Sequence, residues 1–498
     1  MMRLPGRRHP RKPVAANPEP PFRGWGGQGG GSSPVVQAPP QWRATTVQVC
    51  GLWPFAAGSG TPMVGVPLGR SLISGATLCC DPISWFQDAN LIHNPSCFYL
   101  GKPGLGKSTI IRRTALGLAG YGALPLICGD LKPDYVDLIE ALDGQVIRIG
   151  RDRGFLNILD ISTAIAAADR LTGQARGEVL ADARARRQIL VDTLITLARK
   201  ATPSDREQNI LGAALRVLDE RHGGVPVLGD LLSVIEQRPE ALRQVALDRG
   251  DESRYQDITE NLLVSLKGLI GHGRLGHIFS EPSTVQMRRD VPAVFDVSSI
   301  DDSDQTLQAA ALVACWSTGF GAVNIAGALA DAGCEPRRHY FVVLDELWRV
   351  LRAGHGMVER VDELTRLNRQ RGVGVAMCTH TMSDLLALPS AEDRAKARGF
   401  VERAGMVICG GLPRAEMEML TQVIAMSEAE QKTLVEWQDP PAWTSASNRS
   451  APPGRGNFLC KVGGRPGIPI HVALTDSELA LNDTNKRWHE KSRIERAA

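Results

Sequence analysis

A glycine-rich turn that ends in a lysine is the stretch of this sequence with the clearest chemistry. The segment "CFYLGKPGLGKSTIIRR" (97–113) fits the spacing GxxxxGK[ST] and lies between a short apolar run and residues with helical spacing. Backbone N–H groups of residues 102 to 108, at a helix N-terminus, favour bound phosphates. We therefore predict a nucleoside triphosphate site. Its expected binding residues are Gly101, Gly104, Gly106, Lys107, Ser108 and Thr109.

Two side chains of this loop have distinct expected roles. The ammonium of Lys107 would neutralise the β- and γ-phosphate oxygens, which makes it a candidate catalytic residue. The hydroxyl of Ser108 would be a ligand of Mg²⁺.

Two adjacent carboxylates follow a second apolar run. The stretch "FVVLDEL" (341–347) resembles a buried strand, and a core does not tolerate Asp345 and Glu346 unless they act at the C-terminal edge of a sheet. We predict that Asp345 holds Mg²⁺ through water and that Glu346 polarises the attacking water. The alternative is that Asp345 caps the next helix. The triphosphate loop upstream favours the catalytic pair.

These motifs lie in a chain that alternates expected strands and helices, which is typical of a parallel α/β sheet. Apolar runs at 97–100, 123–130, 145–150 and 156–160 alternate with helical spacing at 107–120 and 135–142. Further strands are expected at 291–300, 339–347, 372–380 and 405–411, with helices near 303–332 and 357–369 between them. The runs "NFLCKV" and "IPIHVAL" near the end of the chain are expected to form edge strands.

Composition divides the chain into expected parts. Residues 1–45 are rich in Pro and Gly, and residues 1–43 hold seven Lys or Arg against one acid, which gives +6 against −3 for the remainder. Such a basic tail suits contact with nucleic acid or an anionic surface, although a solvated, disordered arm is the simpler interpretation. We expect a short β-rich lead-in at 46–95, the main α/β domain at 96–160 and 276–475, an α-helical insertion at 161–275, and a C-terminal tail at 476–498.

The insertion carries its own local signal. Residues 161–275 have helical spacing throughout, and Ser204 followed three residues later by Glu207 predicts a capping box.

Composition also bears on the compartment. No run of 18 apolar residues and no signal peptide is found, so we expect a cytoplasmic protein that reaches a membrane only through partners. The ten cysteines are scattered, which indicates reduced thiols.

Four stretches beyond the glycine-rich loop resemble the HerA/FtsK superfamily of RecA-like motor ATPases, most closely the VirB/TraC-class ATPases of conjugative type IV secretion systems. They are 126–150 with the Asn-x-x-Asp of 156–160, then 292–301, then "VVLDELWRVL" (342–351), and "RQRGVGVAMCTHTMSD" (369–384). The resemblance covers about residues 60–475. It implies an α/β RecA-like P-loop NTPase with a mostly parallel sheet flanked by helices, an inserted all-α subdomain, and ATP and Mg²⁺ as cofactors.

The resemblance also assigns two further site residues. Arg369 matches the arginine that reaches the γ-phosphate of a neighbouring subunit, although Arg366 and Arg371 stand nearby. His380 follows Thr379 where the family usually has a glutamine sensor. A neutral imidazole can donate and accept like an amide, so His380 either keeps this role with pH sensitivity or marks a weakened sensor.

The function that the resemblance implies is an ATP-hydrolysing motor of a conjugative type IV secretion apparatus, powering assembly or DNA and protein transfer. It would act as a hexamer at the inner face of the cell membrane, with secretion-channel components as partners. One alternative is a DNA translocase of the HerA/FtsK type that acts directly on DNA, and a second is a nucleotide-switched scaffold with slow hydrolysis. Fewer than a hundred residues precede the motor motifs, which leaves the docking partner open.

Overall fold

The computed structural model of the chain describes residues 62–271, 273, 275–354, 356–365, 371–440 and 452–481. The basic tail expected at 1–45, the first part of the lead-in, the last residues of the C-terminal tail, and both Arg366 and Arg369 lie outside the described residues.

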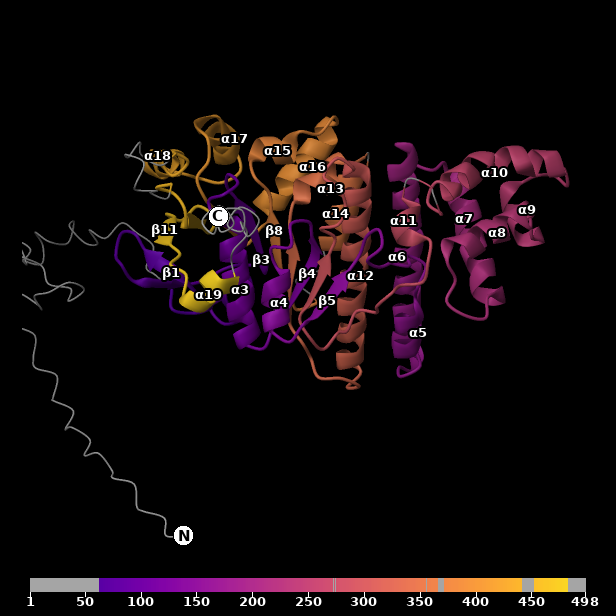
Figure 1. Cartoon of the computed structure of the whole chain (residues 1–498), viewed down its shortest axis with the longest axis horizontal. Coiled ribbons are helices and arrows are strands. Elements are labelled where there is room, and N and C mark those ends of the chain that lie inside the picture. Colours follow the sequence, from indigo (N-terminus) through magenta and orange to yellow (C-terminus); the bar gives the residue numbers. More distant parts are fainter. Residues whose placement is uncertain are drawn as a thin grey trace, which may run out of the picture. The chain divides into compact units, whose positions relative to one another are not determined.

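Eleven strands form one sheet in the described part of the chain, in the order β2-β1-β11-β10-β9-β3-β8-β7-β4-β6-β5 (Figure 1). The run from β9 to β5 is parallel throughout, which is the mostly parallel sheet that the sequence predicted. The strands are β1 (Pro67–Ser71), β2 (Thr77–Cys79), β3 (Ser96–Leu100), β4 (Leu124–Asp130), β5 (Gln145–Arg148), β6 (Ala293–Asp296), β7 (Tyr340–Leu344), β8 (Val373–Cys378), β9 (Met406–Cys409), β10 (Asn457–Lys461) and β11 (Ile468–His471).

The strands near the end of the chain lie inside the sheet rather than at its edge. β10 pairs antiparallel with β9 and β11, and β1 and β2 then extend the same sheet beyond β11. The sequence shows each strand but not its neighbours, because the register Arg70↔His471 joins residues from opposite ends of the described chain. The expected strand at 156–160 is also absent, since this segment is irregular.

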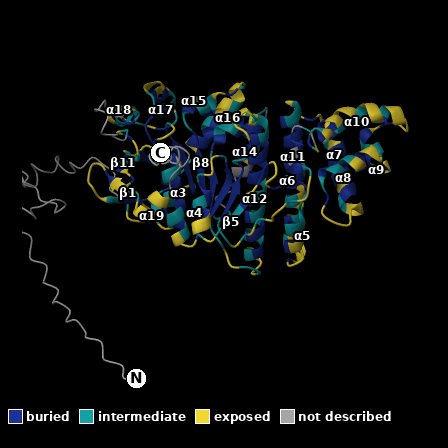
Figure 2. Ribbon diagram, in the orientation of Figure 1, coloured by how far each residue is buried: buried dark blue, intermediate teal, exposed yellow. Residues whose placement is uncertain are grey.

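Helices cover both faces of the sheet. Along β7 the side chains of Phe341 and Val343 join one hydrophobic cluster and those of Val342 and Leu344 join the other, which is the period of two expected of a strand buried on both faces. Figure 2 shows the strands dark blue between the helices. The first cluster includes residues of α2 (Pro82–Gln87), α3 (Lys107–Gly120) and α4 (Val136–Ala141).

The other face is covered chiefly by a long apolar helix, α12 (Gln305–Asp331). Its length and composition would suit a membrane span, but 72% of its apolar window is buried against other parts of the protein. It packs against β4 and α6, and a Cβ placed on Gly319 would lie 2.7 Å from the sulfur of Cys128 in β4. This close approach identifies α12 as a core helix of the sheet domain.

A group of helices connects β5 to β6 and contains no strand among its described residues (Figure 1). The capping box at Ser204 and Glu207 is confirmed, because the Ser204 N–H donates to Glu207 Oε2 at 2.7 Å and the Ser204 hydroxyl accepts from the Glu207 N–H. The helices are α5 (Ser162–Ala168), α6 (Gly173–Arg199), α7 (Asp205–Arg221), α8 (Leu228–Glu236), α9 (Glu240–Ala246), α10 (Glu252–Lys267) and α11 (Gly276–Phe279).

Shorter helices follow β7 and carry the chain back to the sheet. Two of them, α14 and α16, pack against each other. The set comprises α13 (Leu347–Arg352), α14 (Met357–Thr365), α15 (Met382–Leu386), α16 (Ala391–Glu402), the 3-10 turn η1 (Arg414–Glu416), α17 (Met417–Thr421), α18 (Glu428–Glu436) and α19 (Asp476–Leu481).

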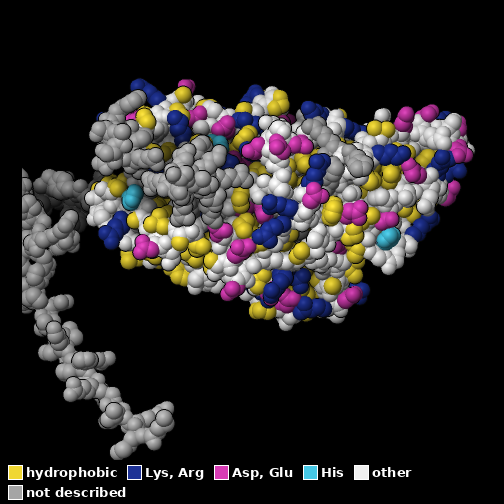
Figure 3. Space-filling view, in the orientation of Figure 1, with side chains coloured by type: hydrophobic (Ala, Val, Ile, Leu, Met, Phe, Trp, Pro, Cys, Tyr) yellow, Lys and Arg dark blue, Asp and Glu magenta, His cyan; other side chains and the backbone are white. Residues whose placement is uncertain are grey.

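Charges of both signs are mixed on the face that Figure 3 shows, where Lys and Arg side chains lie among Asp and Glu. Many arginines of the described residues are paired locally, for example Arg170 with Glu335 at 2.6 Å and Arg199 with Glu207 at 2.7 Å. In such pairs a neighbouring carboxylate balances the positive charge of the arginine side chain.

Candidate active site

Four parallel strands bring the predicted site residues that the structure describes, all except Arg369, to one edge of the sheet. β8 lies between β3 and β7, and β4 follows β7, so the carboxyl ends of all four strands are neighbours. The segments after these ends hold the glycine-rich loop, residues 379–380, the pair 345–346, and a turn at 131–135. Open α/β sheets bind ligands at this edge, because it is where the loops converge.

The glycines of the loop are required by the backbone. Gly104 and Gly106 have φ angles of 81° and 102°, in the left-handed region that disfavours residues with a Cβ. A Cβ on Gly101 would lie 3.2 Å from the Cα of Gly410, so the loop approaches the segment after β9 closely. α3 begins at Lys107 directly after Gly106, as the sequence predicted.

The side chain of Lys107 is buried and folds back over the loop. Its ammonium donates a hydrogen bond to the carbonyl oxygen of Gly101 at 2.5 Å, which places the charge inside the turn. The expected set of amide donors is smaller than residues 102–108, because Pro103 has no N–H and the Lys102 N–H donates to Gly411 O at 3.0 Å. The amides available to phosphate therefore belong to residues 104–108.

Ser108 faces a carboxylate that the sequence analysis did not single out. Burial raises the pKa of Asp134, and a hydrogen bond with Ser108 together with the charge of Arg112 offsets part of that rise. The Ser108 hydroxyl is thus directed towards the acidic turn after β4.

Thr109, the next residue, is partly buried and lines a small cavity beneath α19 with Arg112 and Arg113.

Asp345 directly follows β7, and both of its carboxylate oxygens accept hydrogen bonds. Tyr135 donates its hydroxyl proton to Oδ2 at 3.2 Å, and the Glu346 N–H donates to Oδ1 at 2.9 Å. Burial raises the pKa of Asp345, and the neighbouring Glu346 charge raises it further. The capping alternative is not supported, because α13 has Glu346 at its N-cap position and no side-chain cap.

Glu346 is held at each carboxylate oxygen. Its side chain is nearly buried, with Oε1 accepting from Lys132 Nζ at 3.1 Å and Oε2 accepting from Trp348 Nε1 at 2.6 Å. Its φ of 49° is uncommon for a residue with a side chain and marks a local constraint. Burial alone would raise the pKa of Glu346, but His380 and Lys132 bring it below its ordinary value. The carboxylate is therefore ionised at neutral pH.

His380 joins the glycine-rich loop to Glu346. Its carbonyl oxygen accepts from the Gly101 N–H at 3.0 Å, and its Nε2 lies 3.4 Å from Glu346 Oε2. Burial lowers the pKa of His380, and although Glu346 raises it, the net shift is downward. The ring is therefore mostly neutral at pH 7. Among the described residues, its buried Nδ1 and the hydroxyl of Thr379 have no hydrogen-bond partner.

The turn after β4 supplies residues whose roles the sequence analysis did not predict. Asp130 accepts the N–H groups of Asp134 at 3.0 Å and Tyr135 at 2.8 Å, which fixes the turn that carries Lys132. Burial raises the pKa of Asp130 to about 7 even though these hydrogen bonds lower it. The available signal was the run "GDLKPDY", which places one charged residue at the end of a buried strand and two more directly after it.

The oxygen donors at this edge fit Mg²⁺. Ser108 and Asp345 supply a hydroxyl and a carboxylate, and Mg²⁺ usually takes only one or two carboxylates together with phosphate oxygens and water. No group of three His, Cys, Asp or Glu side chains in the described ranges could hold a metal by itself. A Mg²⁺ ion at this edge would take its remaining ligands from phosphate oxygens and water.

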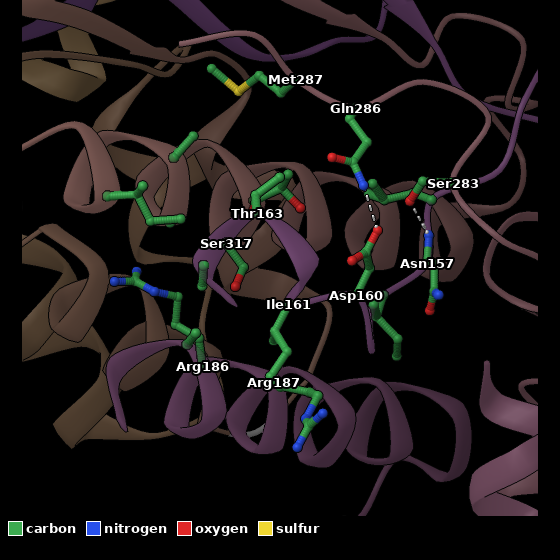
Figure 4. A pocket seen from close by; sticks show the side chains of 18 of the residues that line it. Asn157, Asp160, Ile161, Thr163, Arg186, Arg187, Ser283, Gln286, Met287 and Ser317 are labelled. Carbon is green, nitrogen blue, oxygen red and sulfur yellow. Dashed lines mark hydrogen bonds between the residues drawn. The ribbon is translucent and has the colours of Figure 1, made fainter. Parts of the chain in front are cut away.

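A separate cavity of about 120 Å³ lies between α5, α6 and α12 (Figure 4). Two of its polar side chains, Gln286 and Ser283, are hydrogen-bonded within the chain. Gln286 Nε2 donates to Asp160 Oδ2 at 3.0 Å, and Ser283 Oγ accepts from the backbone N–H of Asn157 at 2.9 Å. No residue of the glycine-rich loop lines it, so it is not part of the candidate active site.

No protein-family model and no curated protein matches this chain. Among solved structures, VirB4 of Thermoanaerobacter pseudethanolicus aligns with a TM-score of 0.61 and 19% identity, over 84% of this chain and 100% of that chain. The conjugative coupling protein TrwB in complex with sulphate aligns with a TM-score of 0.49 and 12% identity, over 77% and 86% of the two chains. TrwB with ADP and Mg²⁺ gives 0.46 and 12%, over 77% and 85%. The chain has the fold of VirB4, which confirms the expected RecA-like P-loop class.

Proposed function

We propose that this chain is an ATP-hydrolysing motor of a conjugative type IV secretion apparatus, powering its assembly or the transfer of DNA and protein. The shared fold with VirB4, which extends over the whole of that chain, and the motif resemblance support this proposal. The observation that carries it is the convergence of Lys107, Glu346 and His380 from three strands at one sheet edge. The motor would work in the cytoplasm, at the inner face of the membrane, through channel components.

The residues of the site would have different roles in hydrolysis. Bound Mg²⁺ supplies charge neutralisation at the phosphates, and Ser108 and Asp345 would hold it. Lys107 would leave the Gly101 carbonyl oxygen and neutralise the β- and γ-phosphate oxygens. The ionised Glu346 would orient a water and accept its proton, while the neutral His380 would donate and accept as the glutamine of the family does.

The proposed active form is a hexameric ring with ATP sites between subunits, in which Arg369 reaches the neighbouring subunit's γ-phosphate. Of the nearby alternatives, Arg371 lies beside Asp182 and Arg186 of α6 in its own chain.

Steady-state ATPase rates test the enzymatic assignment. E346Q should bind ATP with normal affinity and lose about 100-fold or more in kcat, because the water loses its proton acceptor. An unchanged rate in E346Q would show that Glu346 is not the catalytic carboxylate.

Mixing R369A with E346Q subunits should restore part of the ATPase activity. No recovery in such mixtures would contradict an arginine that acts on the neighbouring subunit's nucleotide.

The same assay separates the proposed motor from a DNA translocase. Rates should be measured with no nucleic acid, with duplex DNA and with single-stranded DNA. A rate that is indifferent to DNA supports the secretion-channel motor. Strong stimulation by either form of DNA would favour a translocase that acts directly on DNA.

A further inference from the structure

Lys132 makes an ion pair whose two partners differ sharply in exposure. Its Nζ lies 3.1 Å from Glu346 Oε1, and the lysine side chain is 54% exposed whereas that of Glu346 is 9% exposed. A pair of two exposed groups contributes little, but a nearly buried carboxylate that loses its cation is left uncompensated. The ion pair therefore stabilises chiefly the nearly buried carboxylate of Glu346.

The backbone around Lys132 is fixed, so the contact does not depend on a loose loop. Oδ1 of the buried Asp130 accepts from the Lys132 N–H at 3.4 Å as well as from the Asp134 N–H at 3.0 Å. The next residue of the turn, Tyr135, is fully buried and bonds to Asp345, the residue before Glu346. The turn that presents Lys132 is thus anchored to the end of β7.

The two oxygens of Glu346 have different partners. Oε2 faces Trp348 Nε1 and His380 Nε2, while Oε1 faces Lys132. Among the described residues, Lys132 is the permanently charged group paired with Glu346. Lys107, the cation of the phosphate loop, instead contacts Gly101, so the two lysines have separate tasks.

We propose that Lys132 is a positioning residue for ATP hydrolysis, whose ammonium fixes Oε1 of Glu346 and so holds the carboxylate between the turn after β4 and His380. This inference rests on the proposed function and deepens it. Lys132 acts through Glu346 and not on the nucleotide. Removing it leaves ATP binding in place but lets the carboxylate rotate away from the reacting water.

Substitution of Lys132 in the full-length chain tests this proposal. K132M should lower kcat about 10- to 100-fold, as expected for a misplaced catalytic group, with KM and the Kd of a non-hydrolysable ATP analogue changed less than about twofold. K132R, which keeps the charge, should recover most of the loss. K267M is a matched control, because Lys267 is 59% exposed and pairs with Glu236 at the same 3.1 Å distance.

A double variant separates action through Glu346 from a direct role. In the E346Q background, K132M should reduce the residual single-turnover rate by less than about twofold, because the group that it positions is already gone. An equal loss in both backgrounds would overturn the proposal. So would a tenfold weaker affinity for the ATP analogue with kcat unchanged, which would identify Lys132 as a phosphate ligand.

The outcomes also distinguish this proposal from the one on which it rests. A wild-type chain that does not hydrolyse ATP would overturn both. A normal wild-type rate, an inactive E346Q and a K132M variant with unchanged kcat would overturn only the role of Lys132. Melting temperatures of K132M and K132R close to that of the wild type verify that the variants fold.

Discussion

The hydroxyl of Tyr135 donates a hydrogen bond to Asp345 Oδ2 at 3.2 Å, and the ring that carries it is fully buried. This contact joins the turn after β4 to the end of β7 across the sheet edge where the candidate active site lies. It orients Asp345, the carboxylate that we propose as a Mg²⁺ ligand, although Tyr135 itself would not bind the metal. Groups in the outer shell of metal sites commonly have this role.

Y135F should raise the Mg²⁺ concentration for half-maximal ATPase activity about tenfold, because Asp345 loses the donor that orients it. The change removes one oxygen and leaves the buried ring in place, so the melting temperature should stay close to that of the wild type. Y121F is the control, since the Tyr121 hydroxyl bonds to Gly65 O at 3.2 Å on the exposed surface. Equal Mg²⁺ dependence in Y135F and Y121F would show that the contact does not tune the carboxylate.

H380Q should keep most of the wild-type rate at pH 7.5, because burial lowers the pKa of His380 and leaves a neutral ring that an amide can imitate. The two proteins should diverge at acidic pH. As the pH falls below the ordinary histidine pKa of 6.5, the imidazole of the wild type becomes protonated while the amide does not, so the rate of H380Q relative to wild type should rise.

The ratio of the two rates between pH 5 and 8 is the measurement. H222Q serves as the control, because His222 follows α7 and lies 3.9 Å from the carboxylate of Asp230. A constant ratio for H380Q across this range would mean that protonation of His380 does not limit hydrolysis.

Asp192 in α6 is nearly buried, and its Oδ1 has no hydrogen-bond partner among the described residues. Burial raises its pKa from 3.8 to about 6, with Arg360 offsetting part of the shift. The folded protein therefore holds this proton more tightly than the unfolded chain does. Its contribution favours folding below about pH 4 and is lost as the pH rises through about 6.

D192N should consequently stabilise the protein at pH 8, by about 1–2 kcal/mol, because the amide carries no buried charge. The difference in melting temperature from the wild type should shrink as the pH is lowered and vanish near pH 4. E178Q, which changes an exposed carboxylate of the same helix, should show no such pH dependence. A stabilisation of D192N that is the same at pH 4 and pH 8 would contradict the assignment.

S204A should destabilise the region that begins with α7 by about 1 kcal/mol, since it removes the hydroxyl that accepts the Glu207 N–H. S204T keeps that acceptor and should lose much less. Amide hydrogen exchange in α7 is the direct measurement, because a lost cap frays the first turn. Exchange that is equally slow in S204A and the wild type would show that packing, not the capping box, holds this end.

The predictions that agree with the structure depended on local chemistry. The loop glycines, the start of α3 at Lys107 and the capping box at Ser204 each follow from residues a few positions apart. Their conformations depend on φ angles and hydrogen bonds that neighbouring residues determine. The alternation of apolar runs with helical spacing likewise indicated a parallel sheet before any pairing was known.

The contacts that organise the candidate site could not be predicted in this way. Lys132 and Glu346 are 214 positions apart, and Tyr135 and Asp345 are 210 apart. The sequence contained both ends of each contact but gave no sign that they meet. The pH dependence of His380 could not be predicted either, because the pKa of its imidazole depends on burial and on charges from other strands.

By itself, then, the sequence determined a glycine-rich loop before a helix, a strand followed by two carboxylates and the α/β alternation between them, because short-range sterics and periodicity dictate these features. Only the tertiary structure decided which carboxylate faces which cation, and that β10 and β11 lie inside the sheet. Strand order and ion pairing are set by packing between distant segments, where burial makes an unpaired charge costly.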